Sequence, residues 1–597
     1  MIVSFFTRRT ALFLSSLLIS GGSVAVAQGP SLVKIHEIQG AGSASPMVGK
    51  VVSIRGIVTA DLRASHGGIT VQSAPADFDD NPATSEGLFV KIGAGFTPAI
   101  GDFATIVGTV SESNNLTTLD NVQQYEASTA TKPEPVPVAF PLPEGLTWEN
   151  YESMYLTFPE QLFVTETYNY GRYGAVQLSP GRRLAQPTSF MAPGPEAYAL
   201  QGVYATTGSL LLDDGNTKQN PYPLPFMING ENVRNGDSIN ALTGVLNEFF
   251  NSYQFISTET INWERTNPRQ LTPPDVGGTV KVASYNVLNF FNGNGQGGGF
   301  PTDRGADTAI EFQRQKTKIV AGLVALNADV VGLLEIENDG FGEFSAIAEL
   351  VNSVNAEIAD AELHYAFVQP TATVGTDAIC NAIIYRPSKL QIVGEIATLN
   401  EGPYSYRRPS IVVSFMSKAS GEALTISVSH YKSKSCSNAT GANADAKDGQ
   451  ACYNGERVEQ ATLLAKFLET SPTGIETENQ LIIGDLNAYQ MEDPIRVFTD
   501  AGFVEAIGWA ANLTCGIVPN CNGVPYSYVF QGRSGLLDYA LISPSLRAKM
   551  ADARVWHINA DEAPVLDYNT EYKSADIYDT TPFRSSDHDP VLIGLNL

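Results

Sequence analysis

Several apolar segments in the second half of the chain run directly into an acidic or imidazole side chain. The segment "DVVGLLE" ends at Glu335, "LIIGD" ends at Asp485, and "ALTISVSH" ends at His430. The stretch "SSDHDP" places Asp587 and His588 before the last apolar run. Each residue, taken alone, is more often a turn residue at a strand end than a catalytic one. Their recurrence predicts that polar groups meet at one rim of a layered α/β fold.

The chemical types of these side chains indicate metal-assisted hydrolysis of a phosphodiester. Oxygens from Glu335, Asn286 and Asp587 are hard ligands of the kind that Mg²⁺ or Mn²⁺ prefers. Asp485 can accept a proton from an attacking water, and Asn487, two residues further on, faces the same way along an extended chain. Positioning and charge neutralisation supply most of the acceleration in such reactions.

Two of the six histidines of the chain, His430 and His588, lie at these strand ends. Imidazole groups there can stabilise or protonate phosphate oxygens. Asp538, within "LLDYALI", can pair with one imidazole and fix its tautomer. The other four histidines have no comparable setting, so we expect them to serve packing or the surface.

The elements that must position these residues form a mixed α/β pattern. Helical periodicity is clearest in 311–328, 347–358 and 456–469. Apolar, β-branched segments typical of strands separate these helices, at 280–291, 329–338, 378–387, 411–416, 424–435, 480–489, 535–543 and 590–597. We predict one α/β domain over 280–597, with enough strands for two sheets.

Two β-rich modules are predicted ahead of this domain, over 31–130 and 146–266. The Pro-rich segment 131–145 and the segment 267–279 are predicted linkers. In both modules a Gly-Asp turn introduces a strand, a glycine and a second strand ending in Glu ("GDFATIVGTVSE" and "GDSINALTGVLNE"). The parallel indicates a duplication, for which two barrels of the oligonucleotide/oligosaccharide-binding (OB) type are favoured and two generic β-sandwiches are the alternative.

The first 27 residues have the features of a signal peptide. Arg8 and Arg9 precede an apolar run, and small residues at 25–27 predict cleavage between Ala27 and Gln28. A membrane anchor is the alternative, but the run is short and interrupted by Gly and Ser. We therefore expect a secreted protein, extracellular or periplasmic, without stable membrane association and with a monomer as the favoured state.

Five cysteines are consistent with an oxidising compartment. Their spacing predicts two local disulfides, Cys436–Cys452 and Cys515–Cys521, each closing a short polar loop. The remaining thiol, Cys380, stands in an apolar segment and is expected to pack in a strand.

The net charge of −26 argues against broad, charge-driven binding of nucleic acid. It does not exclude a polyanionic substrate, because divalent cations can offset the repulsion. Asp77, Asp79 and Asn81 alternate in a polar loop, so Ca²⁺ is a candidate ion there, although the Gly and distal Glu of an EF-hand are missing.

A family resemblance is carried by seven segments: "SYNVLN", "DVVGLLEIEN", "GTDAICNAIIYRP", "SVSHYKSKS", "IIGDLNAY", "GLLDYALIS" and "SSDHDPV". In order and spacing they resemble the endonuclease/exonuclease/phosphatase superfamily, which includes pancreatic-type deoxyribonuclease and the apurinic endonucleases. The resemblance covers about 280–597. The Cys-bracketed insert, "CYNGERVEQA" and "WHINADE" resemble more narrowly the secreted bacterial nucleases of the ExeM/NucH type, which also carry barrel-like modules.

The resemblance implies a four-layered αββα sandwich and a set of roles. Glu335 would be the principal metal ligand, with Asn286 and Asp587 close to the metal. His588 would contact the scissile phosphate, oriented by Asp538. The attacking water would be aligned by Asp485 and Asn487.

Other roles implied by the resemblance are less sharply matched. His430 corresponds to the second histidine of the deoxyribonuclease branch, a candidate acid for the leaving 3′-oxygen. Asp377 lies near the place of its acidic partner without aligning cleanly. Arg407 falls at a phosphate-contacting arginine, and Lys432 and Arg457 could meet the nucleic-acid backbone, with a solvated surface role as the alternative.

The expected function is that of a secreted, metal-dependent nuclease acting on extracellular DNA or RNA, with the barrels assisting nucleic-acid binding. Two alternatives stay open. One is a phosphodiesterase acting on lipid or small phosphoesters, as sphingomyelinases of the same superfamily do. The other is a catalytically silent DNA-binding matrix protein.

Overall fold

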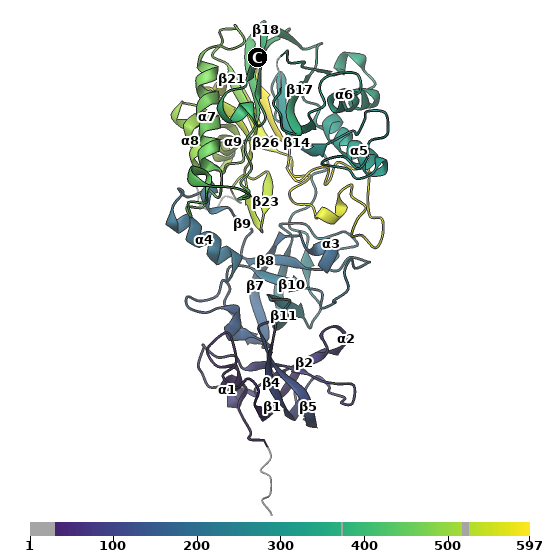
Figure 1. The fold of residues 1–597 in the computed structure, drawn as a ribbon, viewed down its shortest axis with the longest axis vertical. Coiled ribbons are helices and arrows are strands. Elements are labelled where there is room, and N and C mark those ends of the chain that lie inside the picture. Colours follow the sequence, from purple (N-terminus) through teal and green to yellow (C-terminus); the bar gives the residue numbers. More distant parts are fainter. Residues whose placement is uncertain (1–29, 372–373, 516–523) are drawn as a thin grey trace, which may run out of the picture.

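The computed structural model describes residues 30–597 except 372–373 and 516–523. The predicted signal segment 1–27 and the Ala27–Gln28 cleavage site lie outside the described residues. Within the described part of the chain, no helix combines the length and apolar character needed to cross a membrane. Two β-rich modules and a C-terminal α/β domain follow one another along the long axis of the molecule (Figure 1).

Module 1 (residues 31–130) is a closed barrel with the strand order β1-β2-β3-β5-β4. Alternate residues of its strands point inward, where they form a core of Val, Ile and Leu. A short helix, α1 (Ile35–Gln39), buries Ile35 and Ile38 in this core. The strands are β1 (Val51–Leu62), β2 (Gly68–Gln72), β3 (Gly87–Lys91), β4 (Asp102–Ser113) and β5 (Leu116–Thr129), and α2 (Arg63–His66) links the first two.

Module 2 (residues 146–266) repeats this pairing scheme. Five of its strands pair in the order β7-β8-β10-β12-β11, and β11 returns to β7, which closes the ring. The pair β10–β12 is parallel, as is β3–β5, and the other pairs in both rings are antiparallel. These strands are β7 (Tyr155–Glu166), β8 (Val176–Pro180), β10 (Leu210–Asp213), β11 (Ser238–Phe249) and β12 (Ser252–Ser257).

The turns Gly101-Asp102 and Gly236-Asp237 introduce equivalent strands, β4 and β11, of the two rings. The duplication predicted from these turns therefore agrees with the strand pairing. Module 2 carries further elements outside its ring: β9 (Leu184–Ala185), β13 (Trp263–Glu264), α3 (Tyr170–Tyr173) and α4 (Pro195–Ala205).

The two predicted linkers are packed against their neighbours over part of their length. In 131–145, β6 (Val136–Pro137) pairs with β7, and Val138, Phe140 and Leu142 join the core of module 2. In 267–279, the carbonyl of Gln270 accepts a hydrogen bond from Trp556 Nε1 at 2.9 Å, and Val276 is buried in the C-terminal core.

The C-terminal domain is built on two six-stranded sheets. Sheet I has the order β16-β17-β15-β14-β27-β26, with β14 (Val280–Phe290), β15 (Val330–Glu337), β16 (Ala366–Phe367), β17 (Ile379–Tyr385), β26 (Met550–Val555) and β27 (Val591–Leu595). Sheet II has the order β18-β19-β20-β21-β25-β22, with β18 (Leu390–Leu399), β19 (Ser410–Ser417), β20 (Ala423–His430), β21 (Gln480–Asp485), β22 (Val504–Glu505) and β25 (Asp538–Ile542).

Helices cover the outer faces of the two sheets, which gives the expected layered α/β sandwich (Figure 1). The longest, α5, begins where Thr308 accepts a hydrogen bond from Glu311 N and ends at Asn327, which adopts a left-handed φ of 48°. The helices are α5 (Ala309–Leu326) and α6 (Ala346–Glu357) beside sheet I, and α7 (Asn454–Glu469), α8 (Asp493–Asp500) and α9 (Ala506–Cys515) on the other side, with the short α10 (Pro544–Arg547) after β25.

The sheets meet through apolar side chains and one close approach. A Cβ on Gly332 of β15 would lie 2.7 Å from Ile483 Cδ1 and 2.9 Å from Val428 Cγ2, both in sheet II. Only glycine leaves room for this contact, which sets the sheets close together directly beneath the predicted rim.

Module 2 is fixed to the C-terminal domain by strand pairing and buried ion pairs. The strand β24 (Arg533–Gly535), which also pairs with β23 (Tyr528–Phe530), pairs with β9 of module 2. Arg234 Nε lies 2.6 Å from Glu562 Oε1, and Arg183 Nη2 lies 2.8 Å from Asp561 Oδ1.

Candidate active site

Sheet II brings three of the predicted residues into one row. His430 ends β20 and is in register with Asp485, which ends β21. Asp485 is in turn opposite Asp538, the first residue of β25. Adjacent strands lie about 4.8 Å apart, so the three side chains share one edge. The apolar residues that precede each of them are buried and hold the row in place.

Sheet I faces this row with Asn286 from β14 and Glu335 from β15. Asn286 Nδ2 lies 3.2 Å from Glu335 Oε1 and 3.4 Å from Asp485 Oδ2, so its amide bridges the two sheets. Its Oδ1 accepts a hydrogen bond from Leu288 N at 3.0 Å. Asn286 therefore presents an N–H to the carboxylates, which differs from its predicted role as an oxygen ligand.

The strand β15 continues past Glu335 to Glu337, within the predicted range 329–338, but with an irregularity at Glu335. The register of β15 against β17 shifts between Leu333 and Ile336, and Glu335 adopts a φ of 66°. A left-handed non-glycine residue costs on the order of 1 kcal/mol or more. This distortion turns the carboxylate of Glu335 to the rim, where its Oε2 accepts from Asn289 N at 3.0 Å.

His588 and Asp538 form the predicted pair. His588 Nδ1 lies 2.7 Å from Asp538 Oδ2, and its Nε2 lies 3.9 Å from Asp485 Oδ2. Burial alone would lower the pKa of His588, but the carboxylates of Asp538, Asp485 and Asp587 raise it well above its usual value. The imidazole is therefore held as a cation whose Nε2–H points into the site.

The aspartate of this pair is itself held. Ser527 Oγ donates to Asp538 Oδ2 at 2.7 Å. On the other side, the ring of Tyr528 stacks on His588 with centroids 4.4 Å apart. The pair is thus fixed in direction by a hydroxyl and an aromatic face, in the manner of outer-shell support.

His430 has the opposite electrostatic character. Its Nε2 lies 3.4 Å from Asp485 Oδ2 and 3.9 Å from Glu335 Oε1. Burial lowers its pKa well below the usual value, and the charges of Arg408 and His588 lower it further. Two histidines on one rim therefore differ in protonation, one neutral and one cationic.

The predicted pairing of His430 with Asp377 is wrong. Asp377 Oδ2 lies 2.7 Å from Arg408 Nη1, and its Oδ1 lies 3.3 Å from Arg304 Nη2. The Nδ1 atom of His430 is buried and has no hydrogen-bond partner among the described residues. The physical reason is Arg408, whose guanidinium takes Asp377 and leaves the imidazole unpartnered.

Asp485 stands at the centre of the site. Burial raises its pKa to about 7; the cation of His588 opposes this effect, and Asp538 and Glu335 add to it. Its Oδ1 accepts from Asn487 N at 2.9 Å, while Asn487 Nδ2 donates to Tyr431 O at 3.3 Å. Asn487 thus supports Asp485 through its backbone. It lies beyond the end of β21 with a left-handed φ of 47°, so the alternation of an extended strand does not set its direction, and its role in aligning water stays a prediction.

The rim residues fit a divalent cation. Burial raises the pKa of Glu335, and the neighbouring carboxylate of Asp587 raises it further. We name Glu335, Asp485, Asp538 and Asp587 the rim cluster. Repulsion among several carboxylates with hard oxygen atoms is the setting in which Mg²⁺ or Mn²⁺ binds, and Asp485, Asp538 and His588 offer atoms within 4.8 Å of one another.

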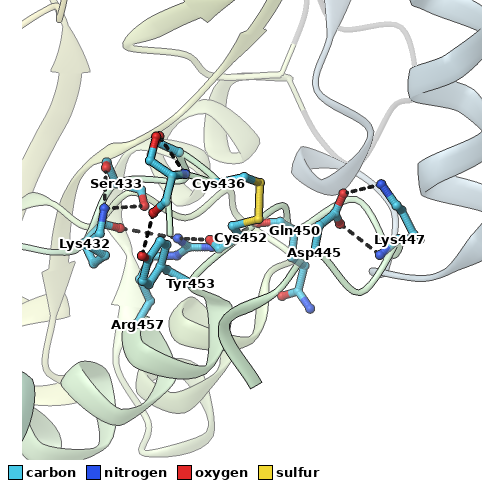
Figure 2. The surroundings of a disulfide bond; sticks show 11 residues. Lys432, Ser433, Cys436, Asp445, Lys447, Gln450, Cys452, Tyr453 and Arg457 are labelled. Carbon is cyan, nitrogen blue, oxygen red and sulfur yellow. Dashed lines mark hydrogen bonds and ion pairs between the residues drawn. A yellow bond between two sulfur atoms is a disulfide. The ribbon is translucent and has the colours of Figure 1, made fainter. Parts of the chain in front are cut away.

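Of the three predicted phosphate-binding residues, Arg407 and Lys432 are partly exposed and Arg457 is buried. Arg407 Nε lies 2.9 Å from Glu456 Oε1 at the edge of the site. Lys432 Nζ donates to Ser433 Oγ at 2.9 Å and lies 4.3 Å above the ring of Tyr453 (Figure 2). Both are partly exposed, so a backbone contact with nucleic acid stays a prediction for them.

Arg457 cannot play the predicted role. Its side chain is fully buried in α7, and its guanidinium donates to the carbonyls of Cys452, Gln450 and Lys432 at 2.8, 3.0 and 3.3 Å (Figure 2). An arginine that is committed to main-chain oxygens and closed off from solvent orders the loop before α7 and does not meet a substrate.

The same loop carries the predicted disulfide Cys436–Cys452, whose Cα atoms are 5.0 Å apart (Figure 2). Cys380 is a free, buried thiol in β17, as expected. The predicted Cys515–Cys521 pair lies outside the described residues, because Cys521 and the side chain of Cys515 are not among them.

The loop proposed for Ca²⁺ forms a different arrangement. Asp77 is ion-paired with Lys34. Asp79 accepts hydrogen bonds from Asn81 N and Thr84 Oγ1, at 2.9 and 3.0 Å, which closes the loop internally. Calcium binding by this loop stays a prediction.

Two site residues were missed by sequence reasoning. Arg408 is buried, donates to the carbonyls of His430 and Tyr431, and lies near enough to lower the pKa of His430. It adjoins Arg407 in "YRRPS", so the dipeptide was a signal, but only the fold tells which arginine turns inward. Tyr528, which stacks on His588, had no local signal.

The Endonuclease/Exonuclease/phosphatase family matches residues 283–588. Similar solved structures include the human Nocturnin catalytic domain with bound sulfate anion, at 16% identity and a TM-score of 0.32, covering 53% of this chain and 93% of that one. A mannosyl-6-phosphatase from Bacteroides thetaiotaomicron is 17% identical, with a TM-score of 0.34, and the match covers 53% of this chain and 100% of that one.

A third similar structure is D. rerio TDP2 complexed with single strand DNA product, at 15% identity and a TM-score of 0.32, covering 53% of this chain and 99% of that one. No curated protein matches the chain. Because the family matches more than half of the residues, the chain belongs to the endonuclease/exonuclease/phosphatase family, whose members hydrolyse phosphoester bonds.

Proposed function

We propose that this protein is a secreted, metal-dependent nuclease of the ExeM/NucH type that hydrolyses phosphodiester bonds of extracellular DNA. The observation that carries the proposal is the arrangement of the cationic His588–Asp538 pair, the neutral His430 and the buried Asp485 around one point. The carboxylate of Glu335 faces this point from the opposite sheet. Hydrolysis of a phosphodiester requires cationic groups, a base and a metal-binding group close together.

The metal would be held by Glu335 and Asp587, which supply carboxylate oxygens from sheet I and from the loop before β27. Mg²⁺ or Mn²⁺ bound there would polarise the phosphate and neutralise the charge that develops on its oxygens. Asn286 fixes Glu335 and Asp485 relative to each other through its amide N–H.

Asp485 is the proposed base. It is buried and has a pKa raised to about 7, so it is poised to accept a proton near neutral pH. Asn487 lies two residues further along and would hold the attacking water against the Asp485 carboxylate. The hydrogen bond from Asn487 N engages Oδ1, so the oxygen that would accept the proton is Oδ2, which also faces Asn286 and His430.

The two histidines would serve different oxygens of the phosphate. Cationic His588 would donate its Nε2–H to a non-bridging oxygen, where it offsets negative charge. Neutral His430 would donate an Nε2–H hydrogen bond to the leaving oxygen. These different roles follow from the opposite pKa shifts of the two histidines. His430 is neutral before substrate binds, so its role is to donate a hydrogen bond.

The two N-terminal modules are proposed to be OB-type barrels that assist nucleic-acid binding. Their shared ring of five strands, with one parallel pair, supports this assignment. With a net charge of −26, the protein would rely on divalent cations and local contacts for DNA, and not on its overall charge.

A substrate comparison tests the proposal. The full-length protein is incubated with plasmid DNA, with RNA and with sphingomyelin vesicles, each in Mg²⁺ and in EDTA. Metal-dependent loss of plasmid is the expected result. Cleavage of the lipid alone would place the enzyme among lipid phosphodiesterases, and retarded but intact DNA would make it a binding protein.

A further inference from the structure

Four glutamates converge where module 1 meets module 2. Glu112 lies near the end of β4, and Glu248 lies near the end of β11. Glu149 belongs to the 3₁₀ turn Trp148–Tyr151, and Glu152 follows it directly. Oxygen atoms of Glu149, Glu152 and Glu248 lie within 4.8 Å of one another. We name these four residues the junction cluster.

In each of the four carboxylates, one oxygen accepts a hydrogen bond from the protein. Glu112 Oε1 accepts from Ser45 N at 2.7 Å and from Thr117 Oγ1 at 2.9 Å. Glu152 Oε1 accepts from Thr117 N at 3.1 Å, so Thr117 links the two acids. The same pattern holds for the other two acids, with Tyr253 OH donating to Glu149 Oε2 at 2.6 Å and Asn115 Nδ2 donating to Glu248 Oε1 at 3.3 Å.

The second oxygen of these carboxylates accepts no hydrogen bond within the described part of the chain. For Glu152 and Glu112 this atom, Oε2, is also buried. The side chain of Glu152 is 0% exposed and that of Glu248 is 8% exposed. Leaving buried carboxylate oxygens unmatched is costly, so these atoms point to a ligand.

No basic side chain balances the junction cluster. Among the residues that the structure describes, none of the four carboxylates forms an ion pair with a lysine, arginine or histidine, and the charges that act on Glu149 and Glu152 are those of other glutamates. Burial raises the pKa of Glu152 well above its usual value, and Glu149 and Glu112 raise it further. Four acids without a counter-charge favour either a shared proton or a cation.

The duplication explains how two of the acids come to lie at the same junction. Glu112 and Glu248 are the final glutamates of the repeated segments "GDFATIVGTVSE" and "GDSINALTGVLNE". The second segment is one residue longer, and the extra residue lies in a bulge at Ala241, where φ is 56° and the register against β7 shifts. The same position of both repeats thus delivers one carboxylate to the shared interface.

We propose that the junction cluster binds a calcium ion that ties module 1 to module 2. The donors are all oxygen atoms, which excludes a site built for a soft metal. Ca²⁺ takes six to eight oxygen ligands in flexible geometry, whereas Mg²⁺ demands a compact octahedron and retains its waters. Acids from both modules, each fixed by a hydrogen bond to one oxygen, suit the larger ion.

The site is independent of the proposed hydrolysis, because all its ligands lie in the N-terminal half. Binding of the ion would affect how firmly the two modules are joined. Without the ion, the carboxylates repel across the junction, and module 1 is held less firmly. With it, the two barrels form one continuous unit beside the C-terminal domain.

Calcium titration of the full-length, EDTA-dialysed protein tests the proposal. Isothermal titration calorimetry and thermal unfolding are run with CaCl₂ and with MgCl₂. The variants are Glu152→Gln/Glu248→Gln, the exposed control Glu126→Gln/Glu144→Gln, which removes the same charge, and Glu335→Gln, which disables the rim cluster. Saturating Ca²⁺ is expected to raise the unfolding midpoint by about 5 °C in wild type, in the control and in Glu335→Gln.

In Glu152→Gln/Glu248→Gln the calcium affinity is expected to fall at least about tenfold. The calcium-free double variant should unfold at or above the wild-type temperature, because a repulsion has been removed, and this result also shows that it folds. Undiminished calcium binding by the double variant would overturn the proposal. So would the absence of any calcium response in wild type, or an equal response to Mg²⁺.

Discussion

The rim cluster and the junction cluster are both groups of buried carboxylates, yet they differ in the charges around them. The rim cluster is surrounded by Arg408, by cationic His588 and by neutral His430. The junction cluster has no basic neighbour in the described chain. A site that must receive and release an anion needs cationic groups besides its metal, whereas a structural site needs only the ion. The charges that surround the acids, more than the number of acids, distinguish a catalytic site from a structural one.

The largest effect is expected for the base of the rim cluster. Asp485→Asn should lower the rate of plasmid cleavage about 10⁴-fold, because it removes the proposed proton acceptor and one charge of the cluster. Rates are measured on supercoiled plasmid under single-turnover conditions. The calcium response of the junction should stay at the wild-type value in the same protein. A rate within tenfold of wild type would remove Asp485 from the mechanism.

A smaller loss is expected when the histidine pair is broken. Asp538→Asn should reduce cleavage about 10³-fold, since an amide neither orients His588 correctly nor stabilises its positive charge. Ser527→Ala removes only the hydroxyl that holds Asp538. It is the milder variant, and it should lower the cleavage rate about tenfold. Equal rates in Asp538→Asn and wild type would show that the pair serves structure alone.

The domain that carries the rim cluster also contains a disulfide, Cys436–Cys452, whereas the modules that meet at the junction contain no cysteine. Replacing Cys436 and Cys452 by serine should lower the free energy of unfolding by about 3 kcal/mol, because the unfolded chain regains the freedom of a loop of about 15 residues. Denaturant unfolding of the C-terminal domain measures this. Cys380→Ser is the control for removing a thiol that forms no disulfide. A change below about 1 kcal/mol in the double variant would mean that the loop is held by Arg457 without the bond.

The smallest expected effect is a pH dependence of stability that is caused by Glu152 in the junction cluster. The folded-state pKa of Glu152 is raised, so the folded protein binds a proton that the unfolded chain has released. The stability of the calcium-free protein therefore falls as pH rises above the usual value near 4.5 and through the raised pKa. Glu152→Gln should lack this fall, and should be more stable than wild type at pH 8 and equal to it at pH 4. The free energy of unfolding is measured against pH by denaturant unfolding for both proteins. If it depends on pH in the same way in wild type and in Glu152→Gln, Glu152 is not a buried acid without a counter-charge.

The sequence predicted most of the rim because its signals are local. An apolar run that ends in Asp485 or His430 indicates both a strand and the residue at its end, and Asp538 begins such a run. The partner of His430 was mispredicted, since Arg408 captures Asp377 from elsewhere in the fold. Arg457 looked exposed because it stands in a polar helix pattern, and its burial depends on the loop that folds over it.

The strands of the N-terminal modules were predicted from alternation, and their repeated Gly-Asp turns pointed to duplication. That Glu112 and Glu248 both lie at the junction of the two modules could not be predicted, because it depends on how the modules pack against each other. The strand β18 was also missed. Its residues are mostly half-buried at a sheet edge, so they lack the apolar run on which the other strand predictions rested.

The central claim is that the acids of the rim perform metal-dependent phosphodiester hydrolysis. The most direct measurement is plasmid cleavage by wild type, Glu335→Gln and Glu152→Gln/Glu248→Gln, each in Mg²⁺ and in EDTA. We predict cleavage by wild type and by the junction variant in Mg²⁺, none in EDTA, and a loss of about 10³-fold or more for Glu335→Gln. Cleavage by Glu335→Gln at the wild-type rate, or cleavage that persists in EDTA, would contradict the account.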